Sequence, residues 1–480
     1  MKFNNPWYEN EELAYEDVFL FQNYFEGKSR LEIDVHPEIS LNTHIPIVVA
    51  NMNAVAGKRM AETMARYGGL VVLPQDMDTD TMKRIILHIK GANVSYDTPI
   101  IVEADDTIRD ALGLMYKRAH QCVILVDKNK KPISLFKPKD FYGYDQFTLL
   151  GNLLKGAAIV AEDGISDEDA FMLMEKHGVG VLPIVNKKGS LIGILTKKQT
   201  IRNSIYQPTL DTEGRLDVTV ALGINNFEEK AKIMFDLGVR TFVLDTAHGY
   251  QKNMIDAIKK CRKLFGDKVK IVAGNVITAE ATKALLEAGA DGVKVGIGPG
   301  AMCTTRIKTG VGRPQFTAVY KCAQEAKKHG GFVWADGGIK EPRDMILALA
   351  AGANHAMLGT IFAGTYESVG DIKYDEQGNM YKENYGMASK KAVFLRNQGL
   401  SKFELARKQM FREGISTSKI YLKEGRASVG DIVDEFIAGL RSAMTYVGAA
   451  NLSEFHEKAI IGVQTQAGFV EGTPHGRVKK

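Results

Sequence analysis

The chain has 480 residues, of which 45% are hydrophobic and 25% charged, so it is too long for one ordinary core and predicts two domains or one large barrel with an insertion. Its 62 basic and 57 acidic residues leave a formal charge of +5 with no concentrated basic face, so we expect no nucleic-acid partner. The four cysteines lack the spacing of a zinc site and are too few for a disulfide scaffold, so we expect a reducing, cytoplasmic location. No apolar run approaches the ~18 residues of a membrane helix, so we expect no membrane partner.

Eight short apolar runs, rich in β-branched residues, recur along the chain with amphipathic segments between them. They are residues 46–52, 69–75, 217–223, 240–246, 269–275, 291–298, 331–337 and 354–360. Continuous apolar strands that alternate with helices are typical of a parallel sheet covered on both faces. Eight such units predict an α/β fold, a closed (β/α)₈ TIM barrel.

The runs end in polar residues or glycines of the kinds that an active site uses. These are Asn51, Gln75, Asp245 with His248, Asn275, Gly298, Asp336 with Gly337, and Gly359 with Thr360. Because the carboxyl ends of the strands form the active-site face of a TIM barrel, we expect these residues to lie around one site.

A segment from about Tyr96 to Tyr206 separates the second and third strands and contains an internal repeat with an offset of 59 residues. Each copy is predicted to run strand, capped helix, strand, turn, strand, and Thr107 and Ser166 begin the two helices. The unit resembles the CBS domain, and two copies resemble a CBS pair. We therefore predict three parts: residues 1–94 as the N-terminal part of the barrel, 95–206 as a tandem CBS insert, and 207–480 as the C-terminal part with the catalytic loop and flap.

In the CBS family the last strand often leads into a G-x-x-T-x-x-D motif that holds a nucleotide ribose, and both copies here depart from it. The second copy has Gly193 and Thr196 but Gln199 in the acidic place, whereas the first keeps Asp140 but has Ser134 and Lys137. A sensor that binds ATP or GTP and a packing module that binds nothing both remain open.

A glycine-rich loop from Gly296 to Gln315 follows the sixth strand and contains Cys303. Glycine lets a backbone adopt positive φ and approach a ligand closely. A structural cysteine does not need such surroundings, so we predict that Cys303 is a nucleophile.

Several ordered motifs give the chain a resemblance, over nearly its whole length, to the IMP dehydrogenase/GMP reductase family. They are residues 245–249, 273–276, 296–315, 335–338, 385–389 and 441–448. The resemblance implies that the Cys303 thiolate adds to C2 of a purine nucleotide, that a covalent thioimidate forms, and that hydride passes between C2 and a nicotinamide ring.

The resemblance also implies roles for the strand-end residues. Substrate binding is expected of Asp336 at the ribose, of Gly338, Gly359 and Thr360 at the phosphate, and of Tyr385, Gly386, Met387 and Ser389 at the base. Cofactor binding is expected of Asp245, Asn275, Gly296 and Gly298. The backbone carbonyls of Gly298, Gly300 and Cys303 are the expected ligands of a potassium ion. Two departures from the family are Ala301, where many members carry serine, and Gln75, where reductases typically carry lysine.

The flap segment distinguishes the two activities of the family. Dehydrogenases use an Arg-Tyr pair there to activate water, and this chain has Ser401-Lys402 at that place. Glu413, together with Thr305, resembles the pair with which reductases protonate the leaving amine, and Glu424 is a second candidate for the acid.

We therefore expect the reductase reaction, an NADPH-dependent reductive deamination of GMP to IMP and ammonia that serves purine salvage. The alternatives are an IMP dehydrogenase that reduces NAD and a catalytically silent CBS nucleotide sensor. The family forms tetramers through its barrels and often octamers through its CBS pairs, so a homotetramer or homo-octamer is expected.

Overall fold

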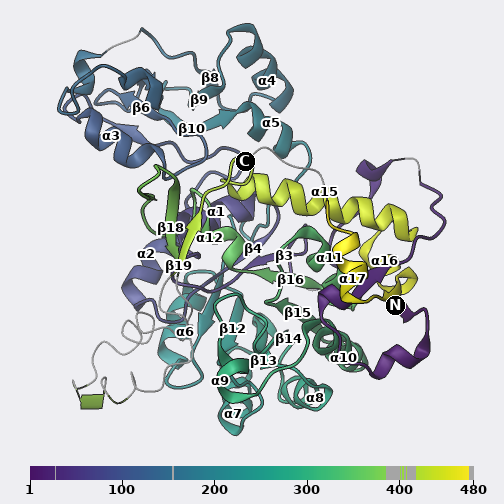
Figure 1. Cartoon of the computed structure of the whole chain (residues 1–480). Helices are drawn as coiled ribbons and strands as arrows, with labels where there is room; N and C mark the ends of the chain where they lie inside the picture. Colours follow the sequence, from purple (N-terminus) through teal and green to yellow (C-terminus); the bar gives the residue numbers. More distant parts are fainter. Residues whose placement is uncertain are drawn as a thin grey trace.

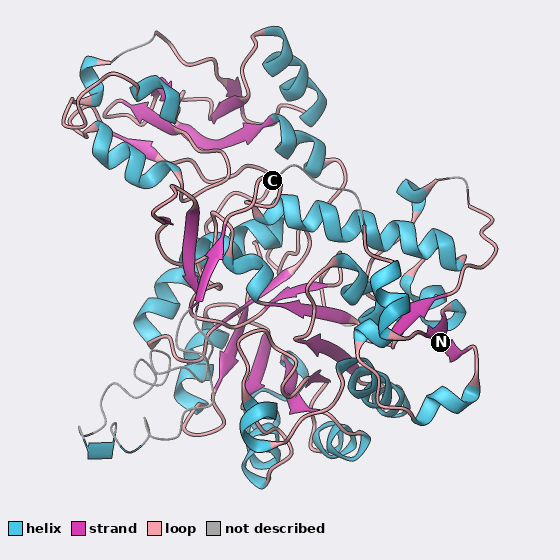
Figure 2. Ribbon diagram, in the orientation of Figure 1, coloured by secondary structure: helices cyan, strands magenta, loops and turns pink. Residues whose placement is uncertain are grey.

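The fold is that of a computed structural model, which describes residues 1–27, 29–39, 41–153, 156–384, 401, 403–404, 407 and 418–474. Eight strands, each paired in parallel with its neighbours, form a closed barrel (Figures 1 and 2). They are β3 (Ile47–Val49), β4 (Leu70–Leu73), β11 (Thr219–Leu222), β12 (Thr241–Asp245), β13 (Lys270–Val276), β14 (Gly292–Val295), β15 (Phe332–Asp336) and β16 (His355–Leu358). Seven of these strands lie within one of the eight apolar runs, and β13 extends one residue beyond its run, to Val276, so the predicted TIM barrel is confirmed.

Alternate residues of each barrel strand face opposite sides of the sheet. Val48, Val72, Val243 and Trp334 belong to the small core inside the barrel. Their neighbours along the strands pack outward against the helices in a much larger core. This two-sided burial explains why the strands read as continuous apolar runs.

A ring of helices surrounds the barrel (Figure 1). Its members are α1 (Lys58–Arg66), α2 (Thr79–Lys90), α6 (Glu228–Asp236), α7 (Lys252–Phe265), α8 (Ala279–Glu287), α10 (Gln315–Lys328), α11 (Pro342–Ala350) and α15 (Val429–Val447). Helix α15 packs against both α11 and α1 and so closes the ring. Shorter helices are α9 (Thr305–Thr309), α12 (Thr360–Ala363), α16 (Leu452–Lys458) and α17 (Gln466–Glu471).

Two small sheets flank the barrel. The first pairs β1 (Lys2–Phe3) and β2 (Val18–Leu20) with β20 (Ile460–Val463), which joins the two ends of the chain. The second contains β17 (Lys373–Tyr374), β18 (Met380–Asn384) and β19 (Ser418–Tyr421). None of the helices in the described part of the chain combines the length and apolar character that crossing a bilayer requires.

The insertion lies outside the barrel, at the top of Figure 1, and contains the repeat that the sequence predicts. The first copy comprises β5 (Ile101–Val102), α3 (Ile108–Met115), β6 (Val123–Val126) and β7 (Pro132–Phe136). The second comprises β8 (Ala161–Glu162), α4 (Asp167–Lys176), β9 (Val181–Val185) and β10 (Leu191–Thr196), followed by α5 (Lys197–Asn203). Thr107 and Ser166 cap α3 and α4 with their side-chain oxygens, and the two sheets share an apolar core.

The nucleotide-motif positions of the second copy make internal contacts. A Cβ on Gly193 would lie 2.4 Å from Cβ of Tyr96, so the glycine makes room for that tyrosine. Thr196 caps α5, and Gln199 accepts a hydrogen bond of 2.8 Å from the Tyr67 hydroxyl at the end of α1. The side chain in the acidic place of the motif therefore ties the insertion to the barrel.

Replacing Tyr67 with phenylalanine is expected to destabilise this junction. The Tyr67 and Gln199 side chains are buried, and loss of the hydroxyl leaves the Gln199 oxygen without that donor, which costs about 1–3 kcal/mol. Thermal unfolding should show a lower midpoint for Tyr67→Phe and an unchanged one for Tyr142→Phe, whose ring is 79% exposed. Equal midpoints for both variants would mean that the contact contributes nothing.

Candidate active site

A cavity of about 1030 Å³ opens at the carboxyl ends of the barrel strands, the face where TIM barrels carry their active sites. Its walls bring together eleven of the predicted catalytic, substrate, cofactor and potassium residues, whereas His248 and Glu424, which are exposed, do not line it. The eleven are Asp245, Asn275, Gly296, Gly298, Gly300, Cys303, Thr305, Asp336, Gly338, Gly359 and Thr360. The volume is at the upper end of the range for small-molecule sites, so it suits a nucleotide together with a second ligand.

The four cysteines differ sharply in their surroundings. Cys122, Cys261 and Cys322 are buried, and burial raises the pKa of each thiol to about 12. Cys303 is exposed in the loop after β14, and its thiol donates to the Thr305 hydroxyl at 3.2 Å. The predicted nucleophile is therefore the accessible thiol of the chain, and it already contacts the threonine predicted to act with it.

Positive-φ glycines shape the wall that carries Cys303. Gly296 has a φ of 149°, and a Cβ there would lie 2.0 Å from the Asp336 carbonyl oxygen. Gly338 has a φ of 79°, and a Cβ there would lie 3.2 Å from Cβ of Pro299. The loops after β14 and β15 therefore lie against each other, and bulkier residues at these positions would separate them.

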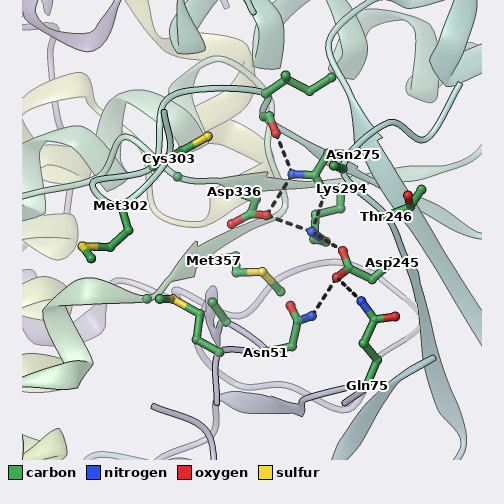
Figure 3. Close-up of a pocket in the computed structure, with 18 of the residues that line it drawn as sticks. Asn51, Gln75, Asp245, Thr246, Asn275, Lys294, Met302, Cys303, Asp336 and Met357 are labelled. Carbon is green, nitrogen blue, oxygen red and sulfur yellow. Dashed lines mark hydrogen bonds and ion pairs between the residues drawn. The ribbon is translucent and has the colours of Figure 1, made fainter. Parts of the chain in front are cut away.

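Four consecutive strands contribute a connected polar cluster at the floor of the cavity (Figure 3). Lys294 Nζ lies 2.9 Å from Asp245 Oδ1 and 2.9 Å from Asp336 Oδ2, and it also donates to Asn275 Oδ1. Asn275 Nδ2 donates to Asp336 Oδ2 at 3.0 Å and to the Gly296 carbonyl at 2.6 Å. The predicted ribose and cofactor residues thus belong to one hydrogen-bonded group.

Lys294 is a site residue that the sequence reasoning missed. Burial alone would lower the pKa of its amine, but the carboxylates of Asp245 and Asp336 outweigh that effect and raise the pKa above its usual value. The amine therefore stays charged. A signal was available in the sequence: Lys294 alternates with Val293 and Val295, which pack outward, so strand periodicity alone directs the lysine into the barrel.

The part of the cavity near Gln75 contains a second lysine that sequence reasoning did not single out. Gln75 Nε2 lies 3.4 Å from Asp245 Oδ2. Lys230 on α6 donates to the carbonyls of Gln75 and Met77 at 2.9 and 2.6 Å, and it also lines the cavity. The ammonium of Lys230 therefore lies against the loop after β4, where the resemblance to reductases leads us to expect a lysine at position 75.

The predicted base-binding residues and most of the predicted flap residues lie outside the described residues. These are Tyr385, Gly386, Met387, Ser389, Lys402 and Glu413. Glu424 is described: it is exposed in the turn that follows β19 and is absent from the cavity wall formed by the described residues.

The fold and site together define a class of protein: a (β/α)₈ barrel with an accessible thiol beside a nucleotide-sized cavity and a carboxylate–lysine cluster on its floor. A family model described as the IMP dehydrogenase / GMP reductase domain matches residues 12–475. The chain belongs to that family, as the ordered motifs of its sequence indicate.

Relatives of known name match along almost the whole chain. A GMP reductase of Mycobacterium tuberculosis is 47% identical over 465 residues and is covered to 96%, as is this chain. An inosine-5'-monophosphate dehydrogenase of Aquifex aeolicus is 36% identical over 482 residues, covering 97% of this chain and 95% of the relative. A solved structure of a cysteine-to-alanine variant of Trypanosoma brucei GMP reductase with guanosine 5'-monophosphate has a TM-score of 0.69 and 32% identity, covering 99% of this chain and 100% of that one.

Proposed function

We propose that this protein is a GMP reductase, which converts GMP and NADPH to IMP, ammonia and NADP. The observation that carries the proposal is a difference in sequence identity. The chain is 47% identical to a named GMP reductase but 36% identical to a named IMP dehydrogenase, over nearly equal lengths. Ser401-Lys402 in place of the water-activating pair supports the same choice.

Cys303 supplies the nucleophile in this reaction. Its thiolate forms a bond to C2 of GMP, and the exocyclic amine then leaves as ammonia after receiving a proton. Glu413, acting with Thr305, is the proposed donor of that proton. The 3.2 Å contact between the Cys303 thiol and the Thr305 hydroxyl supports a role for Thr305 beside the reacting carbon. When bound beside the nucleotide, NADPH would supply the hydride for C2. The C2–S bond would then break, and Cys303 would regain its thiolate as IMP is released.

Residues along one wall of the cavity are proposed to hold the nucleotide. Backbone N–H groups at Gly338, Gly359 and Thr360 would bind the phosphate at the β15–β16 corner, the usual phosphate site of this barrel. Asp336 would accept hydrogen bonds from the ribose hydroxyls. Tyr385, Gly386, Met387 and Ser389 are proposed to contact the base.

Asp245, Asn275, Gly296 and Gly298 are proposed to face the nicotinamide riboside. The size of the cavity, about 1030 Å³, leaves room for it beside GMP. Potassium would bind the carbonyls of Gly298, Gly300 and Cys303, and the 2.9 Å bond from Cys303 N to the Gly300 carbonyl places two of these residues in one tight turn. A cytoplasmic homotetramer or homo-octamer, with residues 95–206 as its CBS pair, completes the proposal.

Nicotinamide absorbance tests the activity directly. Purified protein with GMP and NADPH should consume the reduced cofactor, whereas IMP and NAD should give no reduced cofactor, and a parallel sample with NADH measures the cofactor preference. An absorbance rise with IMP and NAD alone would assign a dehydrogenase. No change in either sample would favour a silent sensor, which ATP or GTP binding to the insertion would then support.

A further inference from the structure

We propose that Lys294 is a positioning residue that holds the carboxylates of Asp245 and Asp336 in fixed orientations and balances their charge, so that the ribose-binding oxygen of Asp336 faces the nucleotide. The inference rests on the proposed function, because it assigns Asp336 to the ribose of GMP. The inference assigns a role to Lys294, which lies within β14 and not among the strand-end residues that the sequence analysis singles out.

The contacts of Lys294 use the full donor capacity of its ammonium group. One N–H is directed at Asp245, one at Asp336 and one at Asn275, and the side chain is only 4% exposed. Room for it comes from Gly274, where a Cβ would lie 2.7 Å from the Lys294 Cβ. A buried ammonium with three acceptors is well stabilised in one arrangement.

The contacts of Asp336 determine which of its oxygens can serve a ligand. Lys294 and Asn275 both bind Oδ2, at 2.9 and 3.0 Å. Within the described part of the chain no hydrogen bond or ion pair uses Oδ1, and the residue lines the cavity. Lys294 thus leaves Oδ1 of Asp336 to accept a hydrogen bond from a ribose hydroxyl.

Asp245 extends the arrangement to the opposite side of the barrel. Lys294 binds its Oδ1, while Asn51 on the β3 side donates to Oδ2 at 2.9 Å and Gln75 on the β4 side does so at 3.4 Å. Lys294 therefore joins Asp245, a proposed cofactor residue, to Asp336, the proposed ribose residue.

The charge of Lys294 matters because both proposed ligands are anionic. Without the ammonium, two carboxylates would face each other in a mostly buried site that must also accept a phosphate-bearing nucleotide. Like charges at short range in a low-dielectric site oppose one another and weaken the binding of an anion.

Calorimetry of GMP binding without cofactor tests the proposal in three variants. Lys294→Met should weaken binding on the order of 10–100-fold, the range for loss of a hydrogen bond to a charged group, and in steady state it should raise the KM for GMP more than it lowers kcat. Lys294→Met with Asp245→Asn restores the wild-type charge of the cluster, so it should recover most of the GMP affinity but not the turnover. Asp245→Asn alone is the reference for the double variant. Lys263→Met, which removes an exposed lysine of α7 outside the cavity wall, is the matched control and should bind GMP as the wild type does.

Wild-type GMP affinity in Lys294→Met, or no recovery in the double variant relative to Lys294→Met, would overturn the inference. If Lys294→Met does not fold, Lys294→Gln, which keeps a hydrogen-bond donor but not the charge, takes its place, and wild-type GMP affinity in that variant would equally overturn the inference. A wild-type protein that neither binds GMP nor oxidises NADPH would overturn the proposed function instead, so the two failures are distinguishable.

Discussion

Cys303→Ala is expected to abolish turnover of GMP while leaving GMP binding intact. The proposed adduct requires a thiolate at the cavity, and Cys303 is the exposed cysteine there, whereas burial raises the pKa of each of the other three thiols to about 12. Alanine removes the nucleophile but keeps the backbone of the glycine-rich loop. NADPH consumption measures the loss, and calorimetry measures the retained binding.

Mass spectrometry of the acid-quenched reaction adds a direct readout, since the wild type should carry a nucleotide adduct on Cys303 and the variant should carry none. Cys261→Ala is the matched control because Cys261 is buried in α7 and is not among the described residues that line the cavity. Steady turnover by Cys303→Ala would require another nucleophile and would refute the covalent mechanism.

Glu413→Gln is expected to lower kcat on the order of 10²–10⁴-fold, the usual contribution of a general acid, with GMP still bound. Glutamine keeps the size of the side chain but cannot donate a carboxylic proton to the leaving amine. Rapid-quench measurement of ammonia release should show that this step, rather than substrate binding, has slowed.

Glu424→Gln is the control for that experiment, since Glu424 is the second glutamate of the region and is exposed in the turn after β19. A wild-type rate for this variant supports Glu413 as the acid. Loss of rate in Glu424→Gln, with Glu413→Gln unaffected, would transfer the role to Glu424.

Much of the architecture could be predicted because barrel strands are buried on both faces and their ends carry the site. The apolar run around Val243 predicts both a strand and the position of Asp245 at its carboxyl end. The repeated caps at Thr107 and Ser166 likewise predict the two helices of the insertion, since an N-cap oxygen has a local and recognisable function.

The partners of each side chain could not be predicted, because they depend on strands that are distant in the sequence. Asp245 lines the cavity, as its place at a strand end predicts, but its partners Lys294, Asn51 and Gln75 come from three other strand ends. Gln199 stands where the CBS motif has the aspartate that holds a ribose, but its side chain accepts a hydrogen bond from Tyr67 in the barrel. In each case the barrel closure or the docking of the insertion decides the contact.

Because only one of the four cysteines is exposed, an electrophile that reacts with thiols should modify this protein at a single residue. A small thiol-reactive reagent meets one accessible thiol per chain, that of Cys303, while the other three thiols are buried in the protein. The amount of reagent bound per chain therefore measures the fraction of protein molecules whose Cys303 is free to react. Protection by a bound nucleotide then becomes a simple occupancy assay, and the same selectivity makes this loop the natural target for a covalent inhibitor.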